Sequence, residues 1–282
     1  MNINWFPGHM LKTKKEIQAN LKLVDLVIEI RDARIVKASA NPDIDKLCSS
    51  KPRLILLNKS DLCEESIVRK WCNNLKSNNI DAIPVNCVSG KGLNGIKGAI
   101  DEIMKEKILR QKNRGIVNIV TRAMVVGIPN VGKSSFINKM AKNNIAKTGD
   151  RPGVTKNKQW IKTKMGLELL DTPGVLWPKF DDMNVALNLA FTGAIKDEII
   201  DVEELAYELV KRLSEICPDK LMERYKLTEL SDDAEKNLYN IGIKRGAVIS
   251  GGAVDYHRIG NIILDEFRAG KIGRICIELP EK

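Results

Sequence analysis

The segment GIPNVGKS, residues 127–134, places the strongest constraint on the fold of this chain. It fits the pattern GxxxxGK[ST] at every fixed position, follows the apolar run RAMVV and precedes SSFINKMAK, whose apolar residues have helical spacing. A glycine-rich turn between a strand and a helix lets backbone N–H groups approach phosphate oxygens closely. The pattern therefore predicts an α/β domain that carries a phosphate-binding loop, the P-loop.

The P-loop pattern also assigns roles to single residues. Lys133 is expected to reach the β- and γ-phosphates of a nucleotide, and the Ser134 hydroxyl is expected to bind Mg²⁺. The other residues expected to contact the nucleotide from this loop are Asn130, Val131, Gly132 and Ser135.

A second phosphate-side motif, DTPG at 171–174, ends the apolar run LELLD. An aspartate at that strand end suits the Mg²⁺ shell, and Gly174 leaves its N–H group free to meet the γ-phosphate, so Asp171 and Gly174 are predicted site residues. Between the two motifs lies RPGVT, in which Thr155 is predicted to close over Mg²⁺ and the γ-phosphate. Thr148 is a less favoured alternative. This succession is typical of the switch loops of a nucleotide hydrolase.

The tetrapeptide NKSD, residues 58–61, follows the apolar run RLILL and is typical of a guanine-reading loop. The Asp61 carboxylate can accept two hydrogen bonds from guanine N1 and N2, which adenine does not supply, and a wrong base leaves these partners unpaired. Lys59 can lay its aliphatic stem over the base, Asn58 can tie this loop to the P-loop, and Ser60 completes the motif. One strand later, the backbone of Cys87 and Val88 is predicted to meet guanine O6.

Together these motifs form a guanine-nucleotide site, for GTP and GDP, in permuted order. The base-reading loops precede the P-loop and the switch motifs along the chain. A circular permutation is tolerated when the original termini lie close together at the surface. Residues 93–121 are expected to join the original C-terminal helix to the original first strand.

Hydrophobic patterning supports this fold class. Short apolar runs predict strands at 24–30, 53–58, 80–84, 122–128, 158–163 and 167–171, and helical spacing appears at 9–22, 64–77, 93–110 and 134–142. This alternation is typical of a mostly parallel sheet with helices on both faces. After about residue 183 the pattern becomes helical, at 184–195, 198–216, 231–242 and 255–269, with one predicted strand in RICIEL (274–279). We predict a permuted GTPase domain at 1–183 and a mostly helical domain at 184–282.

Charge is distributed unevenly along the chain, whose net charge is +10. Residues 1–183 contain 32 Lys and Arg against 18 Asp and Glu, whereas residues 184–282 contain 14 against 18. A basic surface of this kind suits a polyanion such as RNA, although a solvated surface without a partner is the plain alternative. Six dispersed cysteines without a CxxC pair argue against zinc and disulfides and favour a reducing cytosol. No apolar run is long enough for a membrane span, and no membrane partner is expected.

The chain resembles the circularly permuted GTPases of the ribosome biogenesis GTPase A (YlqF-like) family. The resemblance covers nearly the whole chain and includes WFPGHM (5–10), DAR (32–34), NPDI (41–44), NKSD, GIPNVGKS, RPGVT, DTPGVLWPKF (171–180) and the segment 250–275. It implies GTP hydrolysis coupled to late maturation of the bacterial large (50S) ribosomal subunit. It also implies contacts with the subunit precursor, rRNA and ribosomal proteins. Because the G-domain side has the strongest basic density, we expect both domains, 1–183 and 184–282, to contact RNA, and no DNA partner is expected.

Two residues are candidates for assisting hydrolysis. Many GTPases orient the attacking water with a Gln just after DxxG, but here Val175 and Leu176 follow Gly174. Asn130 stands where similar GTPases use an Asn to hold K⁺, an ion able to stabilise transition-state charge. His9, in the family's FPGHM pattern, is a candidate for positioning water, and a structural role beside the helix starting near Met10 is the alternative.

Two other functions are compatible with these patterns. One is an RNA-binding structural protein whose nucleotide site gates its affinity for RNA. The other is a GTPase that serves another RNA or stress pathway. Stimulation of GTP turnover by ribosomal subunits distinguishes an assembly factor from both.

Overall fold

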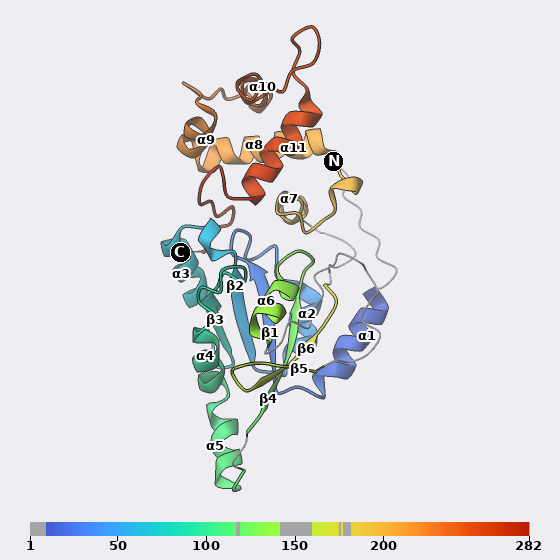
Figure 1. Ribbon diagram of the computed structural model, residues 1–282, viewed down its shortest axis with the longest axis vertical. Coiled ribbons are helices and arrows are strands. Elements are labelled where there is room, and N and C mark those ends of the chain that lie inside the picture. Colours follow the sequence, from blue (N-terminus) through green and yellow to red (C-terminus); the bar gives the residue numbers. More distant parts are fainter. Residues whose placement is uncertain (1–9, 117–118, 142–159, 175, 177–181, 282) are drawn as a thin grey trace. The chain divides into compact units, whose positions relative to one another are not determined.

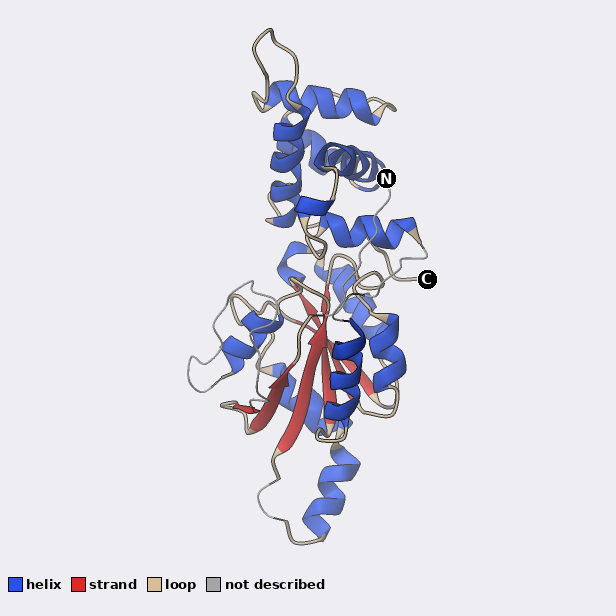
Figure 2. Ribbon diagram, turned by 90° about the vertical axis from the view of Figure 1, so that its right-hand side faces the viewer, coloured by secondary structure: helices blue, strands red, loops and turns tan. Residues whose placement is uncertain are grey.

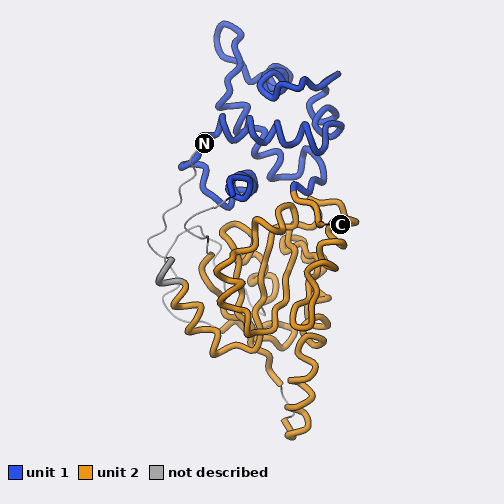
Figure 3. The backbone as a smooth tube through the Cα atoms, turned by 180° about the vertical axis from the view of Figure 1, so that it is seen from behind, with its two compact units in different colours: residues 1–5, 179–277 blue, residues 6–178, 278–282 orange. Residues whose placement is uncertain are grey.

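The structure, a computed structural model, describes residues 10–116, 119–141, 160–174, 176 and 182–281, with backbone only at 10–13. The chain forms two compact units (Figure 3). Unit 1 comprises Lys179–Ile277 together with Met1–Trp5, and unit 2 comprises Phe6–Pro178 together with Glu278–Lys282. The last residues of the chain therefore belong with the unit that contains the P-loop.

Unit 2 is built on one six-stranded sheet with the order β3-β2-β1-β4-β6-β5 (Figure 2). Every neighbouring pair is parallel except β5 and β6, which are antiparallel. All residues of β1 and β2 are buried, as expected of strands covered on both faces. This sheet confirms the predicted mostly parallel α/β class. The strands are β1 Leu26–Asp32, β2 Arg53–Asn58, β3 Ile80–Pro84, β4 Thr121–Gly127, β5 Trp160–Lys162 and β6 Leu167–Asp171.

Helices cover both faces of this sheet (Figure 1). On one face, Ile17 of α1 and Ile44 of α2 form a buried cluster with Val27 of β1 and Val126 of β4. Helices α4 and α6 pack against the opposite face, and α3 packs beside β3. Helix α5 continues beyond α4 and buries none of its side chains. The bounds are α1 Met10–Leu21, α2 Pro42–Cys48, α3 Glu65–Leu75, α4 Gly95–Ile103, α5 Lys105–Asn113 and α6 Lys133–Met140.

The strand order places the loops that follow β1, β2, β4 and β6 at one edge of the sheet. The chain passes from β1 through β2 to β3 and then returns to β4 on the other side of β1. Open α/β sheets bind ligands outside the carboxyl ends of the strands, where the strand order reverses. Asp32, Asn58, Gly127 and Asp171 end β1, β2, β4 and β6, so these residues lie at that edge.

Unit 1 is helical over the residues described. Its helices are α7 Met183–Phe191, α8 Val202–Ile216, α9 Pro218–Tyr225, α10 Ala234–Lys244 and α11 Tyr256–Arg268, with a 3₁₀ turn, η2, at Asp197–Ile199. Aspartate side chains cap the N-termini of α7, α8, α10 and α11, which satisfies backbone N–H groups that a helix leaves unpaired. Leu209 and Leu213 of α8 and Ile259 and Ile263 of α11 are fully buried in its core.

The structure differs from the predicted elements in three places. The predicted strand RICIEL is wrong, because the described backbone of 274–279 pairs with no sheet. The predicted helix 93–110 is interrupted at Met104, whose backbone leaves the helical region, and becomes α4 and α5. Helices α2 and α9 were not predicted, although each begins with a proline, which suits the first helical position.

Two features are absent among the described residues. No helix among them is long and apolar enough to cross a bilayer. The same residues contain no cluster of three or more His, Cys, Asp or Glu side chains arranged to hold a metal ion.

Candidate nucleotide-binding site

The P-loop connects β4 to α6 and lies against the NKSD loop. Gly132 has φ 106°, and a Cβ atom on it would lie 2.3 Å from the Asn58 side-chain nitrogen. Only glycine permits this close approach together with this backbone conformation. Asn58 then bridges two loops, because its Nδ2 donates to Val131 O at 2.7 Å and its Oδ1 accepts from Cys87 N at 2.9 Å.

Lys133, the first residue of α6, curls back over the P-loop. Its Nζ donates to the carbonyl oxygens of Gly127 at 3.1 Å and Ile128 at 2.8 Å. Burial lowers the pKa of Lys133 to about 8, and the Asp171 carboxylate only partly opposes this shift. A cation in this setting gains stabilisation when phosphate anions arrive. The site is therefore electrostatically suited to a polyphosphate.

The DTPG segment approaches the P-loop from β6. Thr172 Oγ1 donates to Val125 O at 2.6 Å, which fixes the segment to β4. A Cβ atom on Gly174 would lie 2.7 Å from Lys133 Nζ, so the backbone here comes very close to the predicted phosphate-binding amine. Burial raises the pKa of Asp171, although nearby Lys133 acts in the opposite direction.

These residues fit a magnesium ion. Ser134 is exposed at the start of α6, and Asp171 ends β6, which neighbours the P-loop strand. Mg²⁺ in nucleotide sites takes one or two protein oxygens and obtains its other ligands from phosphates and water. Burial also makes Asp171 a carboxylate that a cation would stabilise. One hydroxyl and one such carboxylate meet this requirement without a larger acidic cluster.

The NKSD loop leaves β2 in a tight turn. Lys59 has φ 59°, and its Nζ lies 3.0 Å from Asp32 Oδ2. Ser60 donates to Val85 O from its backbone nitrogen at 3.2 Å and from its hydroxyl at 2.9 Å. Asp61 is exposed in the short 3₁₀ turn η1, Ser60–Leu62. Its carboxylate is therefore accessible to a ligand.

The loop after β3 holds the two residues predicted to meet guanine O6. Cys87 is buried, which raises the pKa of its thiol to about 12, whereas Val88 is 80% exposed. The N–H of Cys87 donates to Asn58, and the N–H of Val88 donates to Asn86 Oδ1 at 2.9 Å. A base that accepts from either N–H has to share or replace these bonds.

Of three further residues predicted to belong to the site, the structure describes only one. Asn130 lies in the P-loop with φ 55° and an exposed side chain. His9 and Thr155 fall outside the described residues. Asp32, whose carboxylate contacts Lys59, was not among the predicted site residues, and no local sequence signal identifies this contact.

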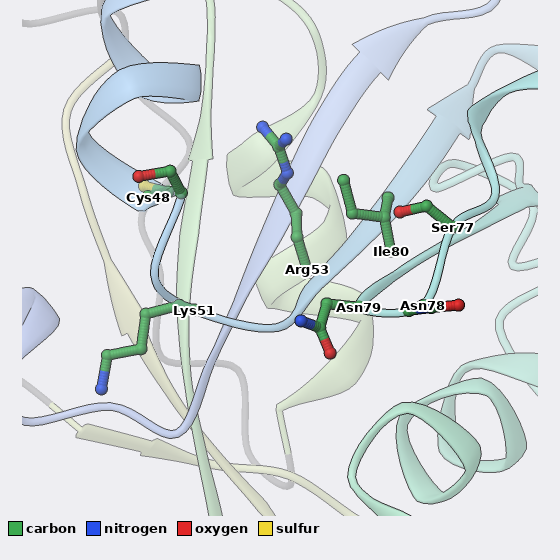
Figure 4. A pocket seen from close by; sticks show the side chains of 8 residues that line it. Cys48, Lys51, Arg53, Ser77, Asn78, Asn79 and Ile80 are labelled. Atoms are coloured by element: carbon green, nitrogen blue, oxygen red, sulfur yellow. The ribbon is translucent and has the colours of Figure 1, made fainter.

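A separate hollow lies at the opposite edge of the sheet (Figure 4). Its lining includes Arg53 and Ile80, the first residues of β2 and β3, and Lys51. Arg53 is already paired with Glu29 at 3.0 Å and with Asp45, and Lys51 Nζ donates to a backbone carbonyl oxygen. The charges in this hollow serve the fold, so the nucleotide loops remain the candidate site.

The fold and these loops define the class of protein: a P-loop GTPase in which the base-reading loops precede the phosphate loop. Residues 122–235 match a family model described as 50S ribosome-binding GTPase. The chain is 45% identical over 281 residues to ribosome biogenesis GTPase A of Bacillus pumilus, and the match covers all of both chains. The chain belongs to the ribosome biogenesis GTPase A family, and it is a GTPase that binds GTP and GDP.

Solved structures agree with this assignment. The fold is similar to that of GNP-bound YlqF from T. maritima, with a TM-score of 0.65, 28% identity and coverage of 96% of this chain and 99% of that chain. It is also similar to a GDP-bound structure of TM YlqF, with a TM-score of 0.64, 28% identity and coverage of 95% and 100%.

Proposed function

We propose that this GTPase acts in late maturation of the large (50S) ribosomal subunit and contacts the subunit precursor, its rRNA and its ribosomal proteins. The observation that carries the proposal is the full-length similarity, at 45% identity, to a relative named for ribosome biogenesis. The family model described as 50S ribosome-binding GTPase supports the choice of the large subunit. Such a protein would work in the cytoplasm, where bacterial subunits are assembled.

The guanine base is read by the loops after β2 and β3. Asp61 accepts from guanine N1 and N2, and its exposure in η1 supports this role. Lys59 covers the base with its stem, Ser60 holds the loop to Val85, and Asn58 links it to the P-loop. Guanine O6 accepts from the backbone of Cys87 or Val88, in exchange for bonds that these N–H groups make to Asn58 and Asn86.

The phosphates are bound by the P-loop. The backbone N–H groups of 130–135 surround the phosphate oxygens, and the amine of Lys133 transfers its hydrogen bonds from carbonyl oxygens to the β- and γ-phosphates. Ser134 and Asp171 would hold Mg²⁺, with Thr155 as a further ligand, and the ion would supply positive charge to neutralise the phosphates. Gly174 offers its N–H to the γ-phosphate from a position close to Lys133.

Two groups assist hydrolysis in this proposal. Asn130 would hold a K⁺ ion, which would supply positive charge in the transition state, and the exposure of its side chain at the P-loop supports this role. His9 positions the attacking water. Leu176 is buried, at 2% exposure, and an apolar side chain cannot orient water, so this task falls to another group.

Charge supports RNA as the partner. Residues 1–183 carry the excess of positive charge. Helix α5 exposes Lys112, and Arg114, directly after the helix, is also exposed. The helical domain at 184–282 is the second RNA- and ribosome-binding element. Phosphate-dominated binding of this kind weakens steeply with salt.

A GTPase assay with and without isolated large subunits, repeated at several salt concentrations, tests the proposal. We expect large subunits to stimulate turnover, small subunits not to do so, and the stimulation to fall as salt rises. Equal turnover with both subunits contradicts the proposal. Binding of RNA at an unchanged GTPase rate favours the alternative, an RNA-binding protein whose nucleotide site gates affinity.

A further inference from the structure

Asp32, the last residue of β1, is buried beside the guanine-reading loop. Its side chain is 3% exposed. Oδ1 accepts from the Arg34 backbone nitrogen at 3.0 Å and from Arg34 Nε at 2.9 Å, and Oδ2 accepts from Arg34 Nη2 at 2.8 Å. Lys59 Nζ lies 3.0 Å from the same Oδ2. One buried carboxylate therefore joins a fixed arginine to the lysine of NKSD.

The backbone around this pair is also fixed. Asp32 and Asn58 are register partners in neighbouring parallel strands, and Ala33 N donates to Asn58 O at 2.9 Å. Asp32 N donates to Ser39 Oγ at 3.1 Å. Lys59 itself has the left-handed φ of 59°. A long lysine side chain has many rotamers, and an anchor for its amine reduces the entropy lost when a base binds.

The charge state of Asp32 suits an anchor. Burial alone would raise its pKa, but the Arg34 and Lys59 cations outweigh this effect and hold the pKa well below its usual range. The carboxylate is therefore ionised at any pH at which the protein works. Charge-assisted hydrogen bonds of this kind are stronger and more directional than neutral ones.

Glu29, three residues earlier on β1, provides an internal comparison. It is also buried, at 1%, and is paired with Arg31 at 2.7 Å and with Arg53 at 3.0 Å. These partners are residues of β1 and β2 and are not part of the NKSD loop or the P-loop. The strand thus carries two buried carboxylates of similar chemistry, and only Asp32 contacts a residue of NKSD.

We propose that Asp32 is a positioning residue for guanine-nucleotide binding, which holds the Lys59 amine so that the lysine stem lies ready against the base. The proposal rests on the role of the NKSD loop proposed above. Because the base is common to both nucleotides, Asp32 affects GTP and GDP equally. It acts on affinity and leaves the chemical step unchanged.

A double-mutant cycle in the full-length protein tests this role. We expect Asp32→Asn to raise the Kd for both GDP and GTP by roughly 10-fold, with kcat at saturating GTP unchanged. In a Lys59→Met background the same substitution should change Kd less than about 2-fold, because the residue through which it acts is gone. The proposal is overturned if Asp32→Asn changes Kd by the same factor in both backgrounds, or if it leaves the Kd of the otherwise wild-type protein unchanged.

Two further variants keep the test decisive. Glu29→Gln also removes a buried carboxylate that pairs with arginines, so it should lower the melting temperature while leaving Kd unchanged. If Asp32→Asn does not fold, Asp32→Glu replaces it, because it keeps the charge near Arg34 but displaces the carboxylate. Asp32→Glu should raise Kd in the otherwise wild-type protein and change it much less in the Lys59→Met background. If Asp61→Asn leaves the preference for guanine intact, the proposed guanine recognition by the NKSD loop is wrong. If Asp61→Asn relaxes this preference while Asp32 variants bind nucleotide normally, only the positioning role of Asp32 is wrong.

Discussion

The NKSD loop, which forms the guanine side of the site, and the P-loop, which forms its phosphate side, each contain a lysine, and the two lysines differ in the charge of their partners. On the guanine side, Lys59 lies 3.0 Å from the buried carboxylate of Asp32, whose pKa is held well below its usual range. On the phosphate side, Lys133 donates to two backbone carbonyl oxygens, and burial lowers its pKa to about 8. One lysine already has an anion beside it, and the other gains most from an anionic ligand.

This difference has an energetic consequence. A loop that is fixed before the ligand arrives loses little conformational entropy on binding. A buried cation that donates only to carbonyl oxygens is stabilised when phosphate anions arrive beside it. We therefore expect the guanine side to select the base of the nucleotide, and the phosphate side to respond to its phosphates. The predictions below test this separation.

The largest effect is expected on the phosphate side. Lys133→Met should reduce single-turnover GTP hydrolysis by roughly 10³-fold, because a preorganised cation facing the developing charge is lost. Lys97→Met, on the exposed surface of α4, is the matched control and should hydrolyse GTP normally. A variant at Lys133 that retained most of its rate would remove the basis for separating the two sides.

On the guanine side, Asp61→Asn should reduce the preference for GDP over inosine diphosphate by roughly 10²-fold, because the acceptor for the guanine amino group is altered. Competition binding measures this ratio directly. The exposed Asp101→Asn on α4 serves as the control. A preference that stays intact would show that base selection lies elsewhere in the site.

The buried charge of Asp32 predicts a pH dependence of stability. Its pKa is lowered on folding from an ordinary value of 3.8, so its ionised form stabilises the folded chain above about pH 4. This contribution is lost as the pH falls through the depressed pKa. Urea unfolding from pH 7 to pH 3 should show a difference between wild type and Asp32→Asn that is constant above pH 5 and shrinks below pH 4. A difference that grew on acidification would contradict this sign.

The smallest effect is expected where the C-terminal residues contact the rest of unit 2. Glu278 accepts from the backbone nitrogens of Lys37 at 2.6 Å and Ala38 at 3.1 Å, and Trp71 Nε1 donates to Glu278 O at 3.1 Å. Glu278→Gln keeps the shape of the side chain and should cost about 1 kcal/mol of unfolding free energy. Nucleotide affinity should change less than about 2-fold, and a larger change would mean that this contact belongs to the guanine side.

Much of the fold was predictable because its signals are local. The six strands and the P-loop lie where apolar runs and fixed glycines placed them. RICIEL has the composition of a strand, but an apolar pattern does not reveal whether a sheet edge is available. The contact between Asp32 and Lys59 was not predictable, because it depends on the parallel pairing of β1 with β2, which brings residues 27 positions apart together. The family resemblance supplied the nucleotide motifs but not this contact.

The contacts of Glu278 also bear on how unit 1 is connected. The chain leaves unit 2 after Pro178, just beyond the DTPG segment, and rejoins it at Glu278, whose backbone nitrogen donates to Arg34 O at 3.3 Å. The segment Lys179–Ile277 is thus joined to unit 2 at both of its ends. Closing a chain at both ends restricts its freedom more than a single tether does. The residue at which the chain rejoins unit 2 is thus hydrogen-bonded to Arg34, two positions along the chain from Asp32, whose carboxylate contacts Lys59.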